Sequence, residues 1–179
     1  FDLLKRSGCN FVGFGAESGS NEILKSIKKG LKIDDLYRAC NIAKKAGIGC
    51  AANFILGHPG ETYQTAKETL DLAKKLPSSY VNIYGLMPIK GTYAYDVLKK
   101  AEKEGKAKFF YDEEYYLSHM SAQDIVPVFE TPEFTKEQRS ELLKIARNIT
   151  KKRAMEYRFG KIIGSFIYVL TKNHKIFNL

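Results

Sequence analysis

The sequence has few cysteines, and none of them has the spacing of a metal site. Its three cysteines, Cys9, Cys40 and Cys50, are 31 and 10 residues apart in a chain of 179 residues. No CxxxCxxC pattern or other close set occurs, so cysteine spacing predicts neither a metal or cluster site nor a disulfide framework. We therefore expect each cysteine to be a small buried apolar residue.

Long hydrophobic runs are also lacking. No stretch of about 18 or more apolar residues occurs, and no secretory leader is recognisable. These absences predict a cytoplasmic protein that does not span a membrane. The sequence begins with Phe1 rather than Met, inside a helical pattern, so we expect the chain to be a fragment of a longer protein.

Acidic residues are scarce at the C-terminal end. The net charge is +9, and residues 136–179 contain eleven Lys or Arg against three Glu, so they carry +8 of it. Hydrophobic residues make up 44% and charged residues 27%, as in ordinary globular proteins. The length fits one domain, or one domain with an appendage, and only the basic tail needs an explanation of its charge.

A strand-like run that ends in glycines and a glutamate occurs twice, each time before a helical stretch. The copies are FVGFGAESG, which starts at Phe11, and NFILGHPGET, which starts at Asn53. A third apolar run over 80–86 predicts another strand. Apolar periodicity, caps and glycine stops predict helices over 20–29, 33–46, 62–76 and 93–104.

This alternation predicts an α/β fold with right-handed crossovers and a parallel sheet. The carboxyl ends of parallel strands share one edge, where such folds bind ligands, so Glu17 and Glu61 should face one cleft. Beyond residue 105 the sequence becomes aromatic-rich and irregular, then helical from about 135, with a last apolar stretch over 162–170. We therefore divide the chain into 1–105 and 106–179, the second part being a cover segment and a basic helical tail.

Three segments together resemble the later strands of radical S-adenosylmethionine (SAM) enzymes, most of all the branch with an attached cobalamin-binding domain. They are GFGAESGSNEILKSIKKG, AGIGCAANFILGHPGET and YGLMPIKGT. The resemblance covers about residues 1–105. It implies the C-terminal half of a partial (βα)6 TIM-like barrel, three parallel strands with helices, plus a C-terminal helical extension.

The resemblance also implies cofactors. The parent protein would use SAM and a [4Fe-4S] cluster, and cobalamin if it belongs to that branch. In the family, electron transfer from the cluster cleaves SAM to a radical that takes a hydrogen atom from substrate. The cluster loop is absent here, so we expect the chain alone to hold no cofactor, to be inactive, and to need the N-terminal half of its barrel and an unknown substrate.

Site residues follow from the resemblance and from residue chemistry. Glu17 can accept two hydrogen bonds from a ribose diol, and Ser18 can add a donor. Ile55 and Gly57 offer an apolar surface and close backbone approach to adenine, as do Met87 and Pro88 after the third strand.

Further residues are expected to shape this site. Gly13, Gly15 and Gly60 would be structural, and Glu61 would brace the turn after the second strand. Two departures from the family motif GxIxGxxE affect Glu61: Asn53 replaces the first glycine, and Glu61 follows Gly57 by four residues rather than three.

The histidines and tyrosines have structural and functional interpretations. His58 lies at the predicted cleft edge and could contact substrate, although a turn histidine is the favoured interpretation. His119 and His174 have no nearby ligand partners in sequence, which favours surface or packing roles. The tyrosine-rich segment 109–116 is interpreted as core packing in preference to a substrate pocket.

The basic tail leaves three interpretations open. It could be a solvated helix packed on the barrel, or an interfacial helix on anionic lipid over 151–175, or, less favoured, a contact to tRNA phosphates. The competing function is thus a non-enzymatic binding module. An exposed sheet edge in a half-barrel also predicts self-association.

Overall fold

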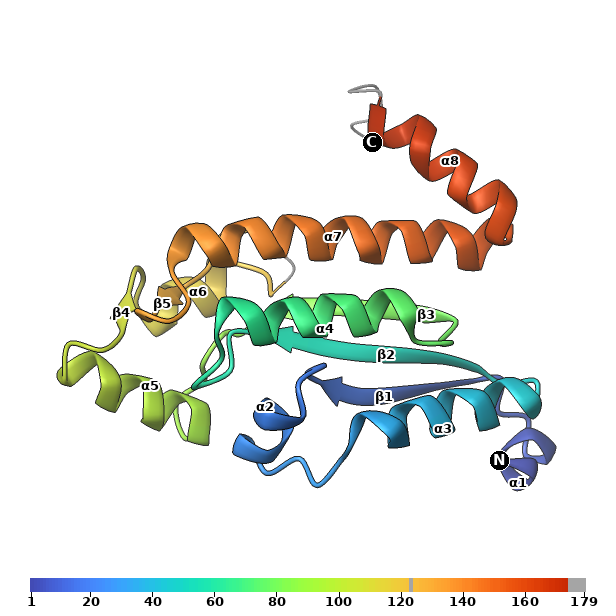
Figure 1. Cartoon of the computed structure of the whole chain (residues 1–179), viewed down its shortest axis with the longest axis horizontal. Coiled ribbons are helices and arrows are strands. Elements are labelled where there is room, and N and C mark those ends of the chain that lie inside the picture. Colours follow the sequence, from blue (N-terminus) through green and yellow to red (C-terminus); the bar gives the residue numbers. More distant parts are fainter. Residues whose placement is uncertain (123, 174–179) are drawn as a thin grey trace.

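The computed structural model describes residues 1–122 and 124–173 and contains an α/β layer followed by helices (Figure 1). The α/β layer contains α1 (Asp2–Arg6), β1 (Phe11–Glu17), α2 (Asn21–Ser26), α3 (Ile33–Lys45), β2 (Gly49–Leu56), α4 (Tyr63–Lys75), β3 (Tyr80–Gly85) and α5 (Tyr93–Lys103). The remainder contains β4 (Lys108–Phe109), α6 (Glu113–His119), β5 (Phe129–Glu130), α7 (Lys136–Phe159) and α8 (Lys161–Asn173). The strands and helices predicted before residue 105 are all present.

Local signals explain most helix ends. The Thr62 side chain accepts a hydrogen bond from the N–H of Thr65 and caps α4. Gly30 and Gly47 follow α2 and α3 and are in the left-handed conformation, with φ values of 66° and 65°, as is typical of glycines that end helices. Ser20, the first residue of the predicted helix, occupies the N-cap position of α2, although its side chain makes no capping hydrogen bond.

The three main strands form one parallel sheet in the order β1-β2-β3, as predicted. Phe11 pairs with Gly49 at one end of β1, and Leu56 pairs with Gly85 at the other end of β2. The register between β1 and β2 shifts between Gly15 and Glu17, which leaves one extra residue in β1 as a bulge. The carboxyl ends of all three strands therefore lie on one edge.

The two faces of the sheet have different surroundings. The even-numbered residues of β2 from Cys50 to Leu56 are buried in one core with α3, α4 and α7. Asn53 and Ile55 alternate with them on the other face and are partly exposed. Because helices cover the outside of an α/β barrel, the partly exposed face corresponds to a barrel interior.

Helix α7 is part of the main core, although it lies in the basic tail. Leu142, Leu143 and Ala146 are buried together with residues of β2, β3 and α4. Figure 1 shows α7 running alongside α4 and β3. The chain segments before and after residue 105 therefore share one hydrophobic core.

The aromatic-rich segment is more ordered than the sequence predicts. Instead of irregular structure it contains helix α6, which begins where Asp112 accepts a hydrogen bond from the N–H of Tyr115. Tyr116 of α6 is buried in a second cluster with Leu98, Val128 and Phe129. Seven residues with one buried position give little helical periodicity, which is why the pattern is not visible in the sequence.

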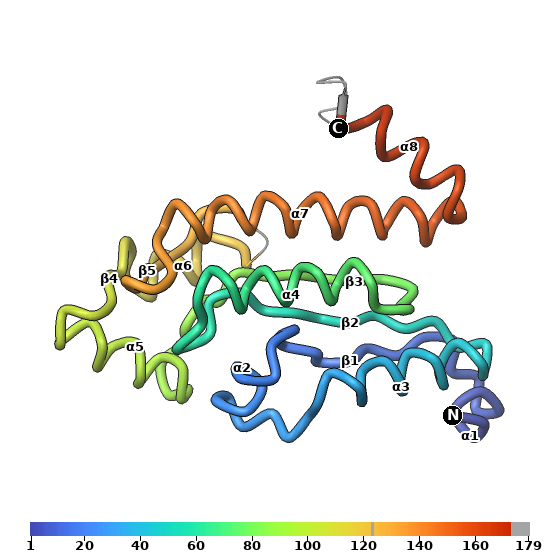
Figure 2. The backbone as a smooth tube through the Cα atoms, viewed as in Figure 1, coloured from blue at the N-terminus to red at the C-terminus, as the bar shows by residue number. Residues whose placement is uncertain are grey.

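Helix α8 leaves the end of α7 at an angle and projects from the rest of the chain (Figure 2). It contains the predicted apolar stretch over 162–170, and most of its large apolar side chains are exposed. Across residues 1–122 and 124–173, no helix has both the length and the apolar character required to cross a bilayer.

The turn after β2 is held by a buried glutamate. Glu61 is 1% exposed, and its Oε2 accepts a hydrogen bond from the N–H of Gly57. Arg139 of α7 is also buried and packs so closely on Gly57 that a Cβ there would meet its Nη1. This arrangement joins the tail helix to the end of the central strand.

Burial shifts the pKa values of both Glu61 and Arg139. It raises the pKa of Glu61 to about 7, against the opposing effects of the Gly57 N–H and the Arg139 charge. Burial lowers the pKa of Arg139 to about 10, against the charges of Glu61 and Glu130. The Arg139 Nε donates to the Phe134 carbonyl at 2.8 Å, and the guanidinium lies 4.3 Å from the ring centre of Phe129. Arg139 thus remains a cation in an apolar and aromatic setting.

We predict that Glu61→Gln removes a pH dependence of stability. A carboxyl with a raised folded-state pKa stabilises the fold fully below pH of about 4.5, and this contribution is lost as the pH rises through about 7. The loss is on the order of 3 kcal/mol. Urea unfolding between pH 4 and 8 should show this loss of stability in the wild type and in Glu114→Gln, a control at an exposed glutamate. Parallel profiles for the wild type and Glu61→Gln would contradict the prediction.

Candidate functional site

The ends of β1, β2 and β3 form a common rim. Glu17 pairs with Phe54, three residues before Gly57, and the N–H of Leu86 donates to the Leu56 carbonyl at 2.8 Å. Leu86 therefore follows β3 at the level where Gly57 follows β2, and Met87 is the next residue. The strand arrows in Figure 1 point to the same end of the sheet. The predicted meeting of these three chain segments at one edge is confirmed.

Glu17 projects onto the partly exposed face of the sheet. Its backbone has φ of 61°, a strained conformation for a residue with a side chain. A Cβ on Gly15 would lie 2.7 Å from Glu17 Oε1, so the carboxylate folds back over this glycine. Lys29 donates to the same oxygen at 2.9 Å. Gly15 thus provides the space that the carboxylate occupies.

Two asparagines continue this polar surface across the sheet. Asn82 Nδ2 of β3 donates to Asn53 Oδ1 of β2 at 2.8 Å, and the two residues pair in the strand register. Gly15 pairs with Asn53, so the Glu17 carboxylate and both amides lie on the same face near the rim. Asn82 is not among the site residues predicted from sequence; the alternation of polar and apolar residues over 80–84 is the signal that could have indicated it.

Ser18 lies behind the rim. It is fully buried, its hydroxyl is 3.1 Å from Thr69 Oγ1, and it accepts a hydrogen bond from the Ser20 N–H. Thr69 Oγ1 also accepts from the Gly19 N–H at 2.8 Å. These contacts fasten the end of β1 to α4 and thereby position Glu17.

His58 lies between the ends of β1 and β2. It is 8% exposed, and burial lowers its pKa, against the raising effects of the Glu17 carboxylate and backbone. The ring is therefore neutral at pH 7. Among the residues that the structure describes, His58 Nε2 has no hydrogen-bond partner. His119 is exposed on α6 and stacks on Tyr115 at 4.9 Å; His174 lies outside the described residues.

The residues after β3 connect the rim to the second cluster. Met87 is partly buried against that cluster, and Pro88 is buried. The Pro88 carbonyl accepts a hydrogen bond from the Tyr116 hydroxyl. Ile55, Met87 and Pro88 give the rim apolar surface beside the polar residues of the sheet face.

The cysteines do not form a metal site. Cys9 is partly exposed near the start of β1, whereas Cys40 and Cys50 are buried in the core. The neighbouring Cys50 and burial both raise the pKa of the Cys40 thiol. Within 1–122 and 124–173, no group of three His, Cys, Asp or Glu residues could hold a metal ion. These donors do not fit an iron–sulfur cluster.

Two curated proteins each match about half of this chain. An uncharacterized methyltransferase of Pyrococcus horikoshii is 38% identical over 89 residues, which is 50% of this chain and 19% of that protein. A tRNA-2-methylthio-N(6)-dimethylallyladenosine synthase of Petrotoga mobilis is 33% identical over 93 residues, 51% of this chain and 21% of the enzyme. The chain thus spans about a fifth of the length of these curated relatives.

A solved structure agrees with these matches. The archaeal Elp3 of Methanocaldococcus infernus, with an N-terminal deletion, superposes with a TM-score of 0.51 and 27% identity. The aligned part covers 56% of this chain and 24% of Elp3. The three parallel strands and their helices therefore correspond to part of a TIM-like barrel. None of these relatives is named for cobalamin, so the expected cobalamin-binding branch finds no support.

The family model that matches is the radical SAM superfamily, over residues 1–73. This range contains β1, β2 and most of α4, the elements that carry Glu17 and the Gly57–Glu61 turn. Residues 1–73 of this chain are therefore similar to the radical SAM superfamily, and the curated relatives and the solved structure are consistent with that match.

Proposed function

We propose that this chain forms one wall of the SAM site in a radical SAM enzyme. The observation that supports this is the position of the Glu17 carboxylate, which lies on the barrel-interior face, over Gly15, at the rim where three strands end. Ligands of α/β barrels bind at this end of the strands.

The residues of the rim suit the nucleoside part of SAM. A ribose diol offers two hydroxyl donors, and a carboxylate accepts both in charge-assisted hydrogen bonds. The Asn53 and Asn82 amides lie beside it and can pair with further polar groups of the ligand. Ile55 and Met87 supply apolar surface for the adenine ring, and the buried Ser18 holds the backbone of this wall in place.

The proposal divides the reaction between this chain and the rest of its protein. SAM supplies the hydrogen-abstracting chemistry of the family when it is bound, and the cluster that activates it needs ligands that Cys9, Cys40 and Cys50 do not provide. We therefore assign to this chain the binding and orientation of SAM, together with the N-terminal half of its barrel.

We predict that Glu17→Gln weakens SAM binding by the full-length protein by about tenfold or more, because an amide loses the charge-assisted acceptor. Equilibrium dialysis with radiolabelled SAM measures this. Glu22→Gln, an exposed acid of α2 a few residues away, is the control for loss of charge. Unchanged affinity in Glu17→Gln, or an equal loss in both variants, would contradict the assigned role.

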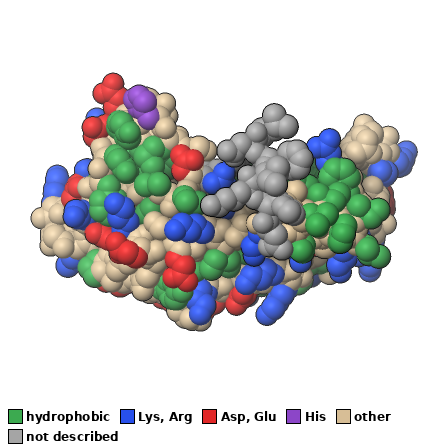
Figure 3. All heavy atoms as spheres, turned by 90° about the horizontal axis from the view of Figure 1, so that it is seen from above, with side chains coloured by type: hydrophobic (Ala, Val, Ile, Leu, Met, Phe, Trp, Pro, Cys, Tyr) green, Lys and Arg blue, Asp and Glu red, His purple; other side chains and the backbone are tan. Residues whose placement is uncertain are grey.

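We propose a second role for the tail, in which α8 rests on an anionic lipid surface. The exposed apolar side chains of α8 are Ile162, Ile163, Phe166, Val169 and Leu170. Its sequence contains no acidic residue, and Lys161 and Lys172 flank the apolar face. Figure 3 shows this hydrophobic patch with lysine and arginine side chains around it. Apolar side chains framed by cations are typical of helices that lie in a membrane interface.

Vesicle flotation tests the role of α8. We predict that the chain floats with vesicles containing phosphatidylglycerol, and that Ile162→Ser/Phe166→Ser abolishes flotation because it removes the inserted surface. The control Ile42→Ser/Leu117→Ser removes two other exposed apolar residues, which are 49% and 46% exposed, and should still float. Flotation that survives the α8 substitutions, or a tail that binds tRNA and no vesicles, would exclude the lipid role.

A further inference from the structure

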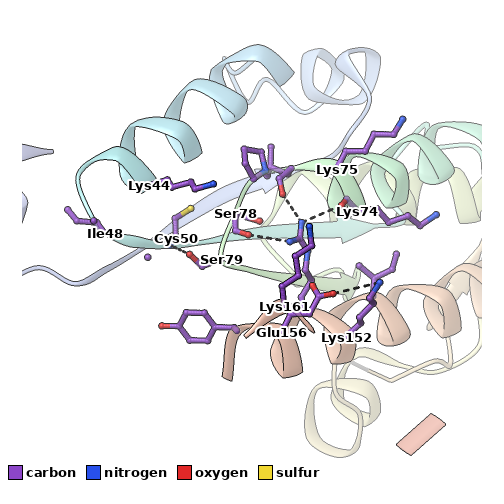
Figure 4. Close-up of a pocket in the computed structure, with 17 residues that line it drawn as sticks. Lys44, Ile48, Cys50, Lys74, Lys75, Ser78, Ser79, Lys152, Glu156 and Lys161 are labelled. Atoms are coloured by element: carbon purple, nitrogen blue, oxygen red, sulfur yellow. Dashed lines mark hydrogen bonds and ion pairs between the residues drawn. The ribbon is translucent and has the colours of Figure 1, made fainter. Parts of the chain in front are cut away.

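A pocket of about 770 Å³ lies at the end of the sheet opposite to the rim. Its walls come from the ends of α3 and α4, the start of β2, the loop before β3, and the junction of α7 and α8 (Figure 4). The volume lies within the range of small-molecule sites. None of the residues assigned to the SAM wall contributes to it.

The pocket has a large excess of positive charge. Its lining contains one carboxylate, Glu156, and six cationic side chains, which are Lys44, Lys74, Lys75, Lys152, Arg153 and Lys161. Like charges in one pocket repel each other, and they are retained at lowest cost where an anion compensates them.

Some of these cations have partners in the chain. Arg153 donates to the carbonyl of Leu76 at 2.6 Å and to other carbonyls at the end of α4, so it caps that helix. Lys152 lies 3.7 Å from Glu156, and Lys74 pairs with Asp71. Among the described residues, Lys44, Lys75 and Lys161 take part in no ion pair. Figure 4 shows Lys44 and Lys161 directed toward the loop of Ser78, whereas Lys74 and Lys75 extend away.

Helix dipoles explain Lys44 but not Lys161. Lys44 lies in the last turn of α3, where a cation interacts favourably with the helix dipole. Lys161 is the first residue of α8, where the same dipole disfavours a cation. Its position beside the other cations therefore needs another explanation, and an anion in the pocket supplies one.

A buried hydroxyl at the pocket also lacks a partner. Ser78 is 5% exposed, and its Oγ makes no hydrogen bond within the part of the chain that the structure describes. Leaving such a group unsatisfied costs free energy, which a ligand oxygen could recover. The pocket lining also has apolar residues, including Ile48, Leu76, Pro77 and Tyr157.

From these observations we propose that the pocket binds a phosphate ester. Lys44 and Lys161 contact the phosphate oxygens, Ser78 donates to one of them, and the apolar wall receives the organic part. A multivalent anion fits better than a carboxylate, because a single charge would leave most of the positive charge uncompensated. The ligand is either a free phosphorylated compound or the headgroup of a phospholipid.

Calorimetric titration of the full chain tests the proposal with two probes, inorganic pyrophosphate and dihexanoyl phosphatidic acid. We expect binding of at least one, and a loss of about tenfold or more in Lys44→Gln/Lys161→Gln because two phosphate contacts are removed. The matched control Lys25→Gln/Lys100→Gln removes two exposed lysines of α2 and α5 and should change affinity by less than about twofold. Ser78→Ala should weaken binding without lowering the melting temperature, because it removes an unpartnered hydroxyl.

The two probes distinguish the sources of the phosphate. Tight binding of pyrophosphate indicates a free phosphorylated compound, and much tighter binding of phosphatidic acid indicates a lipid headgroup; both support the site. No binding of either probe by the wild type would overturn the proposal, as would an equal loss in the control variant. Neither variant touches the residues of the SAM wall, so this test is independent of the SAM proposal. Lys161 also flanks the apolar face of α8, so the titration uses soluble probes without vesicles and does not measure the lipid role of α8.

Discussion

The parallel pairing of β1, β2 and β3 is the constraint on which the candidate site depends. Because all three strands run in one direction, their carboxyl ends reach the same edge, and residues far apart in sequence meet there. The bulge before Glu17 adds a second effect. It turns the glutamate backbone into a strained conformation and lays the carboxylate over Gly15, on the face that a closed barrel would enclose. Strain of this kind is frequent at ligand sites.

The two ends of the sheet are held by contacts from the tail. At the rim, Arg139 of α7 packs on Gly57 beside the buried Glu61. At the opposite end, Arg153 of the same helix caps α4. Two of the positive charges in the tail therefore stabilise the fold itself, which the net charge of the tail does not indicate. The cations left over gather in the pocket at the α7–α8 junction and around the apolar face of α8, and these are the two surfaces for which we propose anionic partners.

Most of the α/β layer could be predicted from sequence because its signals are local. Thr62, Gly30 and Gly47 define helix ends through their own backbone and side-chain chemistry, and the apolar run of β2 reports a strand with helices packed on it. The roles of Arg139 and Asn82 could not be predicted in this way. Arg139 is 78 residues from Glu61, and only the packing of α7 brings them together; Asn82 matters only once the strand register places it beside Asn53. The SAM-site assignment of Ser18, Ile55, Met87 and Pro88 stays a prediction, and the structure places Ser18 behind the rim.

Hydrogen–deuterium exchange of the full-length protein, with and without SAM, tests the central claim most directly. If the three strand ends form one wall of the SAM site, SAM should slow exchange together at the amides of 15–17, 53–57 and 85–87. Slower exchange confined to one strand, or found only around the pocket at the α7–α8 junction, would contradict the account.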